Sequence, residues 1–473
     1  MLFPTALFGA FFAITLAVSW LLMPRPRLWK PFILLASLLF YGAADWRFVP
    51  LLVGVIVVNQ IAAVGIARGI GPSGRWWVIG AIAVDLGVLG VFKYLGFLAE
   101  SVNAAFLGLG LGDGLPALRL LLPIGISFYI FQAISYVVDV HRGRIKPASW
   151  IDFAVFQAFF PHLIAGPIVR ASEFIPQLAT PRSPRAIAAV PALFLIAGGM
   201  VKKVVIADFL ATDIVDPVFG APGSASAVET ITAIYAYAIQ IYCDFSGYTD
   251  MAIGLAMLLG FWFPQNFNRP YTAASVQDFW RRWHMTLSRW LRDYLYIPLG
   301  GSRVSPARTD INLMATMLLG GLWHGASWSF VAWGGMHGAA LATERALAAR
   351  RTRSAGPQPR RWPVWVSVIV VFHFVALTWV LFRAQSLAGA GEVLVRLWSG
   401  WSTPTTLLSA TVIVLVIIGL TMQWVPDRWW RLGEVQVARL PVVAQGLLFA
   451  LVIVAISSLT SDRGVAPFIY FQF

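Results

Sequence analysis

Two histidines of this 473-residue sequence lie inside apolar, tryptophan-rich segments. His284 follows a tryptophan in the string DFWRRWHMTLSRW, and His324 follows one in GGLWHGASW. An ionisable side chain in an apolar membrane segment is costly and is therefore a candidate for function. Imidazole has an unperturbed pKa of about 6.5, which suits proton exchange near neutral pH. Both residues are candidate catalytic groups, and the alternative for each is a packed, hydrogen-bonded core histidine.

Small and aromatic residues surround His324. The nearby glycines are Gly320, Gly321 and Gly325. Because glycine permits close backbone approach, a substrate would be able to reach the His324 ring. Trp323 and Trp328 are candidate substrate-binding residues, whereas His337 is a weaker candidate because it lies at the end of the apolar run.

Four arginines accompany His284: Arg281, Arg282, Arg289 and Arg292. If residues 278–296 form one helix, these arginines lie opposite a face that carries His284 and several tryptophans. This pattern predicts an amphipathic helix in a membrane interface. The arginines would then contact lipid headgroups, or they would bind the phosphates of an anionic acyl donor.

A third polar segment is QIYCDFSGYTDM at residues 240–251. Asp244 and Asp250 interrupt an apolar stretch, and Gly247 between them predicts a break near the membrane surface. Asp244 is a candidate for lining the substrate site. The alternative is that these carboxylates cap helix starts at a turn.

The composition determines which elements must position these side chains. Hydrophobic residues make up 59% of the chain and charged residues 12%, against roughly 25% charged in soluble domains. Disorder is excluded by the apolar content, and a disulfide scaffold is excluded because Cys243 is the only cysteine. No zinc or nucleotide-binding motif occurs. Repeated apolar runs of about 20 residues predict an all-α, polytopic membrane bundle of roughly ten to thirteen helices. We expect a single domain over residues 1–473, with residues 240–338 as its catalytic core.

The net charge of +14 is best explained by membrane topology rather than by nucleic-acid binding. Arginine and lysine concentrate in short loops, which the positive-inside rule assigns to the cytoplasm. The clearest case is the basic loop at residues 345–361, and residues 25–30 form a second. The uncharged residues 220–228 predict an outer loop, and the N-terminus is expected outside.

The longest motifs of the chain resemble those of the membrane-bound O-acyltransferases, in the branch of bacterial alginate and peptidoglycan O-acetyltransferases. The matching strings include CDFSGYTDMAIG, QNFNRPY, DFWRRWHMTLSRWLRDYLYIPLGG, GLWHGASWSFVAWGGMHG and the C-terminal FIYFQF. The resemblance covers most of the chain. It implies that His324 is the catalytic histidine and that His284 is the second functional histidine. It also implies a helical bundle around a central funnel.

The same resemblance implies a reaction and its partners. A thioester in the cytoplasm, acetyl-CoA or an acyl carrier, would donate an acyl group to hydroxyls of a polysaccharide at or beyond the outer face of a bacterial inner membrane. A periplasmic acetyltransferase would be a partner, with no tightly bound cofactor, no metal and no nucleic acid.

In that reaction we expect His324 to act as the base, with an acyl-histidine intermediate as a variant. His284 would stabilise the oxyanion or orient the donor. The open alternatives for the protein are a D-alanyl transferase of teichoic acid type, an acyl or sugar transporter without chemistry, and an assembly scaffold. The acceptor polysaccharide is also open.

Overall fold

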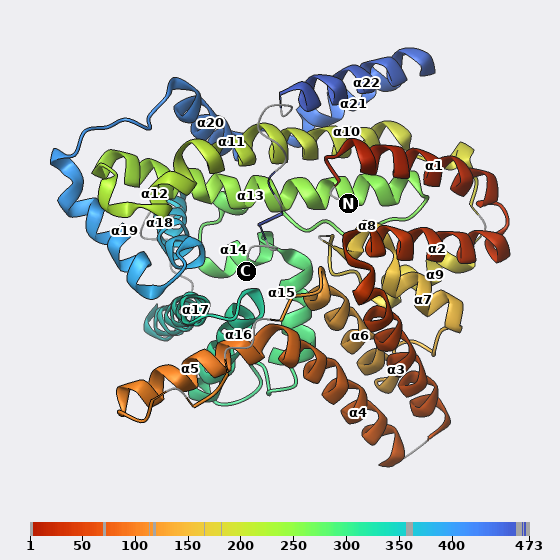
Figure 1. Cartoon of the computed structure of the whole chain (residues 1–473), viewed down its shortest axis with the longest axis horizontal. Helices are drawn as coiled ribbons and strands as arrows, with labels where there is room; N and C mark the ends of the chain where they lie inside the picture. The colour runs from red at the N-terminus through yellow and green to blue at the C-terminus, as the bar shows by residue number, and fades with distance from the viewer. Residues whose placement is uncertain are drawn as a thin grey trace. The chain divides into compact units, whose positions relative to one another are not determined.

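The computed structural model of the chain is built from helices (Figure 1). It describes residues 3–69, 72–112, 114–116, 120–164, 166–180, 182–355, 363–459, 466 and 468–469. No strand occurs in these ranges, so the all-α prediction is confirmed.

The helices up to residue 220 include several that are long and apolar. They are α1 (Ala6–Leu22), α2 (Pro26–Asp45), α3 (Val49–Arg68), α4 (Pro72–Leu89), α5 (Leu95–Gly108), α6 (Ile126–His141), α7 (Trp150–Ala158), α8 (Phe160–Leu163), α9 (Ala171–Ala179), α10 (Ala189–Met200), α11 (Asp208–Leu210) and α12 (Asp216–Gly220). A π-helical turn, η4 (Val201–Ala207), joins α10 to α11.

The remaining helices carry the two candidate histidines. They are α13 (Ala227–Leu258), α14 (Val276–Arg282), α15 (Met285–Leu291), α16 (Pro306–His324), α17 (Trp328–Ala355), α18 (Val364–Arg383), α19 (Leu387–Ser399), α20 (Ala410–Thr421), α21 (Asp427–Ala438) and α22 (Val442–Ser458). A π-helical segment, η8 (Arg292–Tyr296), follows α15 directly.

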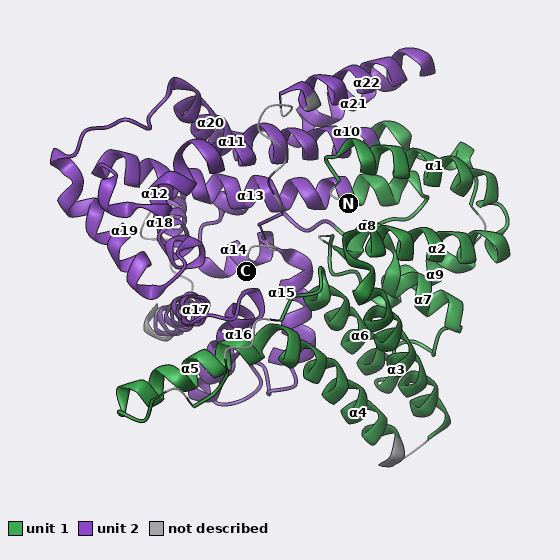
Figure 2. Ribbon diagram, in the orientation of Figure 1, with its two compact units in different colours: residues 1–192, 252–264 green, residues 193–251, 265–473 purple. Residues whose placement is uncertain are grey.

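The chain forms two compact units, which Figure 2 shows in green and purple. Unit 1 comprises residues 1–192 and 252–264, and unit 2 comprises residues 193–251 and 265–473. Within unit 1, α3 packs against both α4 and α6, and α2 packs against α7. Both candidate histidines belong to unit 2, so the catalytic chemistry expected from the sequence lies within one unit.

Glycines allow α16 and α17 of unit 2 to pack closely. A Cβ atom on Gly321 would lie 2.2 Å from the carbonyl oxygen of Phe330, and one on Gly334 would lie 2.3 Å from that of Met317. Gly338 lies against Met314, so the contacts run in opposite directions along the two helices. The pair is therefore an antiparallel hairpin whose backbones touch, and α16 ends at His324.

Several helices are long and apolar enough to cross a membrane. Among the described residues these are 26–68, 74–108, 189–220 and 364–383, and α20 with α21 forms a fifth candidate bent by 93°. The protein is a multi-pass membrane protein. The sequence-based count of ten to thirteen helices stays a prediction.

The predicted break at Gly247 is wrong, because α13 runs without interruption through residues 240–251. Gly247 has a packing role instead. A Cβ atom there would lie 2.7 Å from the carbonyl oxygen of Gly199, and one on Gly199 would lie 2.5 Å from that of Gly247. The glycine therefore permits a helix crossing and does not end the helix.

The basic segment at residues 345–361 is helical over its first part, because α17 continues to Ala355. Residues 356–361 lie outside the described residues. Arg345 forms an ion pair with Asp310 of α16, with 2.6 Å between Nη2 and Oδ2.

Candidate active site

His324 is the last residue of α16, and the chain changes direction immediately after it. Gly325 adopts an extended conformation as the residue that follows the helix. A Cβ atom on Gly325 would lie 2.0 Å from the ring of Phe330. The glycine after His324 is therefore required by packing at this turn. His324 itself is buried, with 3% of its surface exposed.

His284 lies at a break between two short helices. The prediction of one continuous amphipathic helix over residues 278–296 is wrong, because α14 ends at Arg282 and α15 begins at Met285. His284 has φ 42° and ψ 54°, a left-handed conformation that is uncommon for a non-glycine residue. Such a conformation persists only where the surroundings hold it in place, and it is found often at functional sites.

Asn266 holds this break in place. Its Oδ1 atom accepts hydrogen bonds from the backbone N–H of Thr286 at 3.1 Å and from the Thr286 hydroxyl at 2.8 Å. Its main-chain oxygen accepts from the N–H of Met285 at 2.8 Å. The first N–H groups of a helix have no partner within the helix. Asn266 therefore caps α15 from another segment of the chain.

The ring of His284 completes the same cluster, with Nδ1 3.2 Å from Oδ1 of Asn266. Both residues are fully buried. Asn266 is not among the residues predicted for the site, although it lies in the quoted string QNFNRPY. No periodicity or spacing rule connects it with His284.

The structure brings the two candidate histidines together. Their ring centroids are 6.5 Å apart, and the ring of Trp323 lies 6.1 Å from His284 and 5.0 Å from His324. Trp333 and Phe382 also contact His324, at 5.2 Å and 5.3 Å. The site is thus a pair of imidazoles enclosed by aromatic rings.

The electrostatics of His284 follow from this enclosure. His284 lies outside the helices that are long enough to span a membrane. Burial lowers its pKa to about 3, because a low-dielectric environment disfavours the charged ring. The ring is therefore neutral at physiological pH and carries one nitrogen lone pair.

Asp244 belongs to a buried ionic cluster that no pattern in the sequence predicted. Lys203 of η4 forms ion pairs with both Asp244 and Asp208, the second at 2.7 Å. Asp244 also accepts a hydrogen bond from the backbone N–H of Ile469 at 3.0 Å. The carboxylate is thus engaged with protein groups, and its role in substrate binding stays a prediction.

Phe468 is connected to His284 through aromatic contacts. The ring of Phe468 lies 4.6 Å from Tyr248 and 5.5 Å from Phe245. Phe245 in turn meets His284 edge to face at 4.7 Å. The ionic cluster around Lys203 therefore holds Ile469 through Asp244, and the neighbouring Phe468 packs against the aromatic residues next to His284.

The predicted donor-binding arginines differ in their surroundings. Arg282 pairs with Asp278 at 2.9 Å, and Arg292 pairs with Asp293 at 2.6 Å. Arg281 is exposed, and Arg289 is half-buried. Their part in binding the donor stays a prediction, as does that of Trp328, which is 57% exposed at the start of α17.

His337 has the bonding pattern of a structural histidine. Its Nδ1 accepts a hydrogen bond from the indole N–H of Trp280 at 3.3 Å, so its proton resides on Nε2. Nε2 lies 3.0 Å from the hydroxyl of Thr378, which itself donates to the carbonyl oxygen of Val375. This chain links α14, α17 and α18, and it explains His337 by packing alone.

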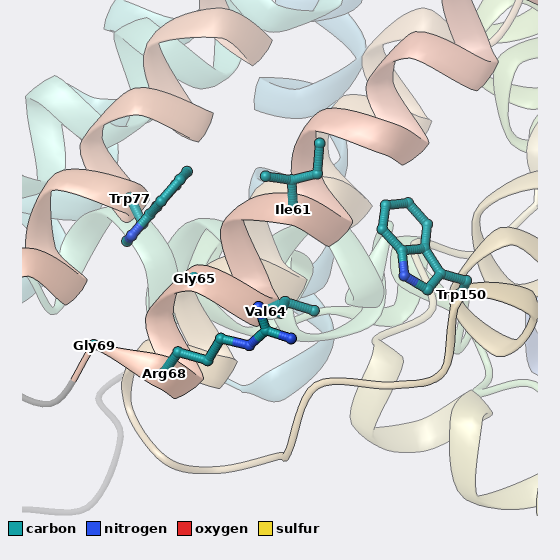
Figure 3. Close-up of a pocket in the computed structure, with 7 residues that line it drawn as sticks. All are labelled: Ile61, Val64, Gly65, Arg68, Gly69, Trp77 and Trp150. Atoms are coloured by element: carbon teal, nitrogen blue, oxygen red, sulfur yellow. The ribbon is translucent and has the colours of Figure 1, made fainter.

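Metal-ligating side chains do not cluster at these histidines in the part of the chain that the structure describes. Within the described ranges no group of three or more histidine, cysteine or acidic side chains is placed to hold a metal ion. A surface pocket of about 490 Å³ lies in unit 1, where Figure 3 shows Trp77 and Trp150 on either side of α3. It contains none of the candidate catalytic residues.

Comparison with known proteins matches the region that contains both candidate histidines. The sequence model of the membrane-bound O-acyltransferase family matches residues 105–384. The chain is 39% identical to a probable alginate O-acetylase (AlgI) of Pseudomonas putida, over 93% of this chain and 94% of that protein. It is also 39% identical to a peptidoglycan O-acetyltransferase of Helicobacter pylori, over 78% of this chain and 73% of that protein.

A more distant similarity extends to another branch. A teichoic acid D-alanyltransferase of Streptococcus thermophilus is 28% identical, over 55% of this chain and 68% of that protein. The identity is thus higher, and the coverage greater, for the proteins named as O-acetylases.

Proposed function

The chain belongs to the membrane-bound O-acyltransferase family, and from this premise we propose that it acetylates hydroxyls of an exported or cell-envelope polysaccharide. The enzyme is an O-acyltransferase. Relatives named for alginate and peptidoglycan O-acetylation support a polysaccharide acceptor. The observation that carries the proposal is the pair of buried imidazoles, 6.5 Å apart between ring centroids.

The proposed reaction is acyl transfer from a thioester to a hydroxyl. His324 takes the hydroxyl proton while the oxygen forms an ester bond with the thioester carbonyl carbon. The C–S bond breaks, and the leaving thiolate receives the proton from the His324 imidazolium. The two imidazoles are close enough for a single bound substrate to contact both. The surrounding aromatic rings exclude water, which would otherwise hydrolyse the thioester.

The location and partners follow from the same proposal. The donor is a cytoplasmic thioester, acetyl-CoA or an acyl carrier, and the enzyme lies in the bacterial inner membrane with its N-terminus outside. The acyl group is transferred toward polysaccharide hydroxyls at the outer face, and a periplasmic acetyltransferase is the expected partner. Positive charge in residues 345–361 supports the cytoplasmic orientation of that segment.

The proposal predicts that His324→Ala abolishes transfer, with a loss of at least 100-fold, because general-base catalysis contributes about 10²–10⁴ in rate. The assay follows labelled acetyl from a thioester into polymer in proteoliposomes that contain the purified enzyme and its partner. His373→Gln is the matched control, because His373 is exposed and bonds only Tyr235 and the carbonyl oxygen of Ile369 among the described contacts.

Normal acetylation by a folded His324→Ala variant would contradict the proposal and favour a transporter or a scaffold. The same proteoliposomes supplied with a D-alanyl thioester test the second branch of the family. Transfer of D-alanine without transfer of acetyl would show that the donor is a D-alanyl thioester and not an acetyl thioester.

A further inference from the structure

The proton on the neutral His284 ring is assigned by its neighbours. The backbone N–H of Thr286 can only donate, and it points at a side-chain atom of Asn266 at 3.1 Å. That atom must therefore be the amide oxygen Oδ1 and not the amide nitrogen. Because Oδ1 only accepts, the His284 nitrogen that lies 3.2 Å from it must carry the proton.

This bond leaves the lone pair of the neutral ring on Nε2. The orientation is held firmly because Asn266, His284 and Thr286 are almost completely buried. The three donors that converge on Oδ1 come from two sides of the helix break, so the ring and the cap of α15 are fixed by one oxygen. The left-handed backbone of His284 places its ring at this oxygen while α15 begins with the next residue.

We propose that Asn266 is a positioning residue that holds the proton of His284 on Nδ1 and thereby makes Nε2 a hydrogen-bond acceptor. The position of the proton does not depend on the proposed function. Only the role of Nε2 in binding substrate rests on it. An imidazole in this form has no N–H on Nε2 to offer a developing oxyanion. His284 therefore orients a hydroxyl-bearing substrate by accepting its hydrogen bond, while His324 supplies the base.

The neighbours of His284 agree with a neutral, accepting ring. The rings in contact with it belong to Phe245, Phe267, Trp323 and His324. Of these, only His324 on α16 has an ionisable side chain.

The first test observes the tautomer directly, by ¹⁵N NMR of ring-labelled protein in lipid bilayers. The chain has six histidines, and the His284→Gln spectrum identifies the signals of interest. The expected result is a protonated Nδ1 and a bare Nε2 at neutral pH, with Asn266→Leu shifting the population toward the form protonated on Nε2. A parent ring protonated on Nε2 would overturn the proposal, as would an unchanged tautomer in Asn266→Leu.

The second test measures transfer kinetics. Hydrogen-bond partners that fix the tautomer of metal-binding histidines contribute about 10–100-fold in affinity or activity. By analogy, Asn266→Leu should lower kcat by roughly 10–100-fold with little change in KM. Asn266→Asp keeps the acceptor and should recover most of kcat. Its carboxylate favours the charged ring, so the rise of activity with pH should move to higher pH.

Thr286→Val is the matched control, because it removes one hydrogen bond from the same oxygen without touching the imidazole. It should leave the tautomer and the pH profile as in the parent protein. If Thr286→Val and Asn266→Leu alter both readouts equally, Asn266 acts only by capping α15 and the proposal fails. The NMR result does not depend on which donor or acceptor the enzyme uses, so failure of the proposed function is recognised separately.

Discussion

At the scale of single residues, charge and hydrogen bonding in unit 2 are settled by partners from distant parts of the sequence. Lys203 forms ion pairs with Asp208 and with Asp244, and Asn266 accepts a hydrogen bond from His284. A buried ion pair need not increase stability, but removing one partner leaves an uncompensated charge in a low-dielectric environment. The ionic cluster is therefore a point at which a single change should be severe.

We expect Lys203→Met to destabilise the protein by about 3–5 kcal/mol, because it leaves two buried carboxylates without their cation. Thermal unfolding of the purified protein in detergent measures the effect. Adding Asp244→Asn to the same variant should recover part of the loss.

Lys202→Met is the matched control for this prediction. Lys202 pairs with Asp250, whose side chain is 24% exposed, against 4% for that of Asp244. Because solvent screens its charges, a more exposed ion pair contributes less to stability. Equal losses of stability in the Lys202 and Lys203 variants would contradict the importance of burial in the ionic cluster.

At the scale of elements, the two candidate catalytic histidines are placed by close helix contacts and by a helix break. The backbones of α16 and α17 touch at Gly321 and Gly334, and His324 ends α16. A displacement along this hairpin therefore moves the ring of His324. If His324 is the proposed base, a small error in its position lowers the rate by a large factor.

We expect Gly334→Ala to lower kcat and to destabilise the protein by about 1–3 kcal/mol, because overpacking forces the two backbones apart. The new Cβ atom would lie 2.3 Å from the Met317 carbonyl oxygen, which cannot rotate away. Transfer kinetics and thermal unfolding of the same preparation measure the two effects.

The neighbouring substitution Gly335→Ala is its control. There the added Cβ atom would meet only Leu318, at an ordinary distance of 3.5 Å. Alanine is the better helix former by about 1 kcal/mol, so this variant should be as stable as the parent or more so. A variant at Gly334 that behaves like the one at Gly335 would disprove the hairpin contact.

At the scale of the whole molecule, apolar helices and a basic composition define a multi-pass membrane enzyme. Hydrophobic residues make up 59% of the chain, and the net charge is +14. The arginines of residues 345–361 contribute to this charge, and the positive-inside rule places them in the cytoplasm. Under the proposed function, this predicted orientation places residues 345–361 on the same side as the donor thioester.

We expect a cysteine at Thr352 to be labelled only from the cytoplasmic side and one at Ser224 only from the outside. The measurement is labelling by a membrane-impermeant thiol reagent, in intact spheroplasts and in inverted vesicles. The native Cys243 is buried, and replacing it with serine removes any background. Labelling of both positions from the same side would reject the proposed topology.

The amino-acid sequence by itself determined the class of protein and identified two histidines as candidate catalytic residues. The apolar composition indicates that the chain lies in a membrane, because so much exposed apolar surface is stable only in lipid. His284 and His324 stand out because an ionisable residue is rare among apolar neighbours. The long motifs around them then pointed to the acyltransferase family.

Only the tertiary structure decided how these residues are placed. The break at His284 was missed because a helical pattern continues through it, while the cap that ends the pattern comes from Asn266, outside the segment. The same holds for Asp244, whose partner Lys203 lies on another helix. Hydrogen bonds and ion pairs between distant segments leave no periodic trace in a sequence, so the proton on His284 is assigned only once the fold brings Asn266 beside it.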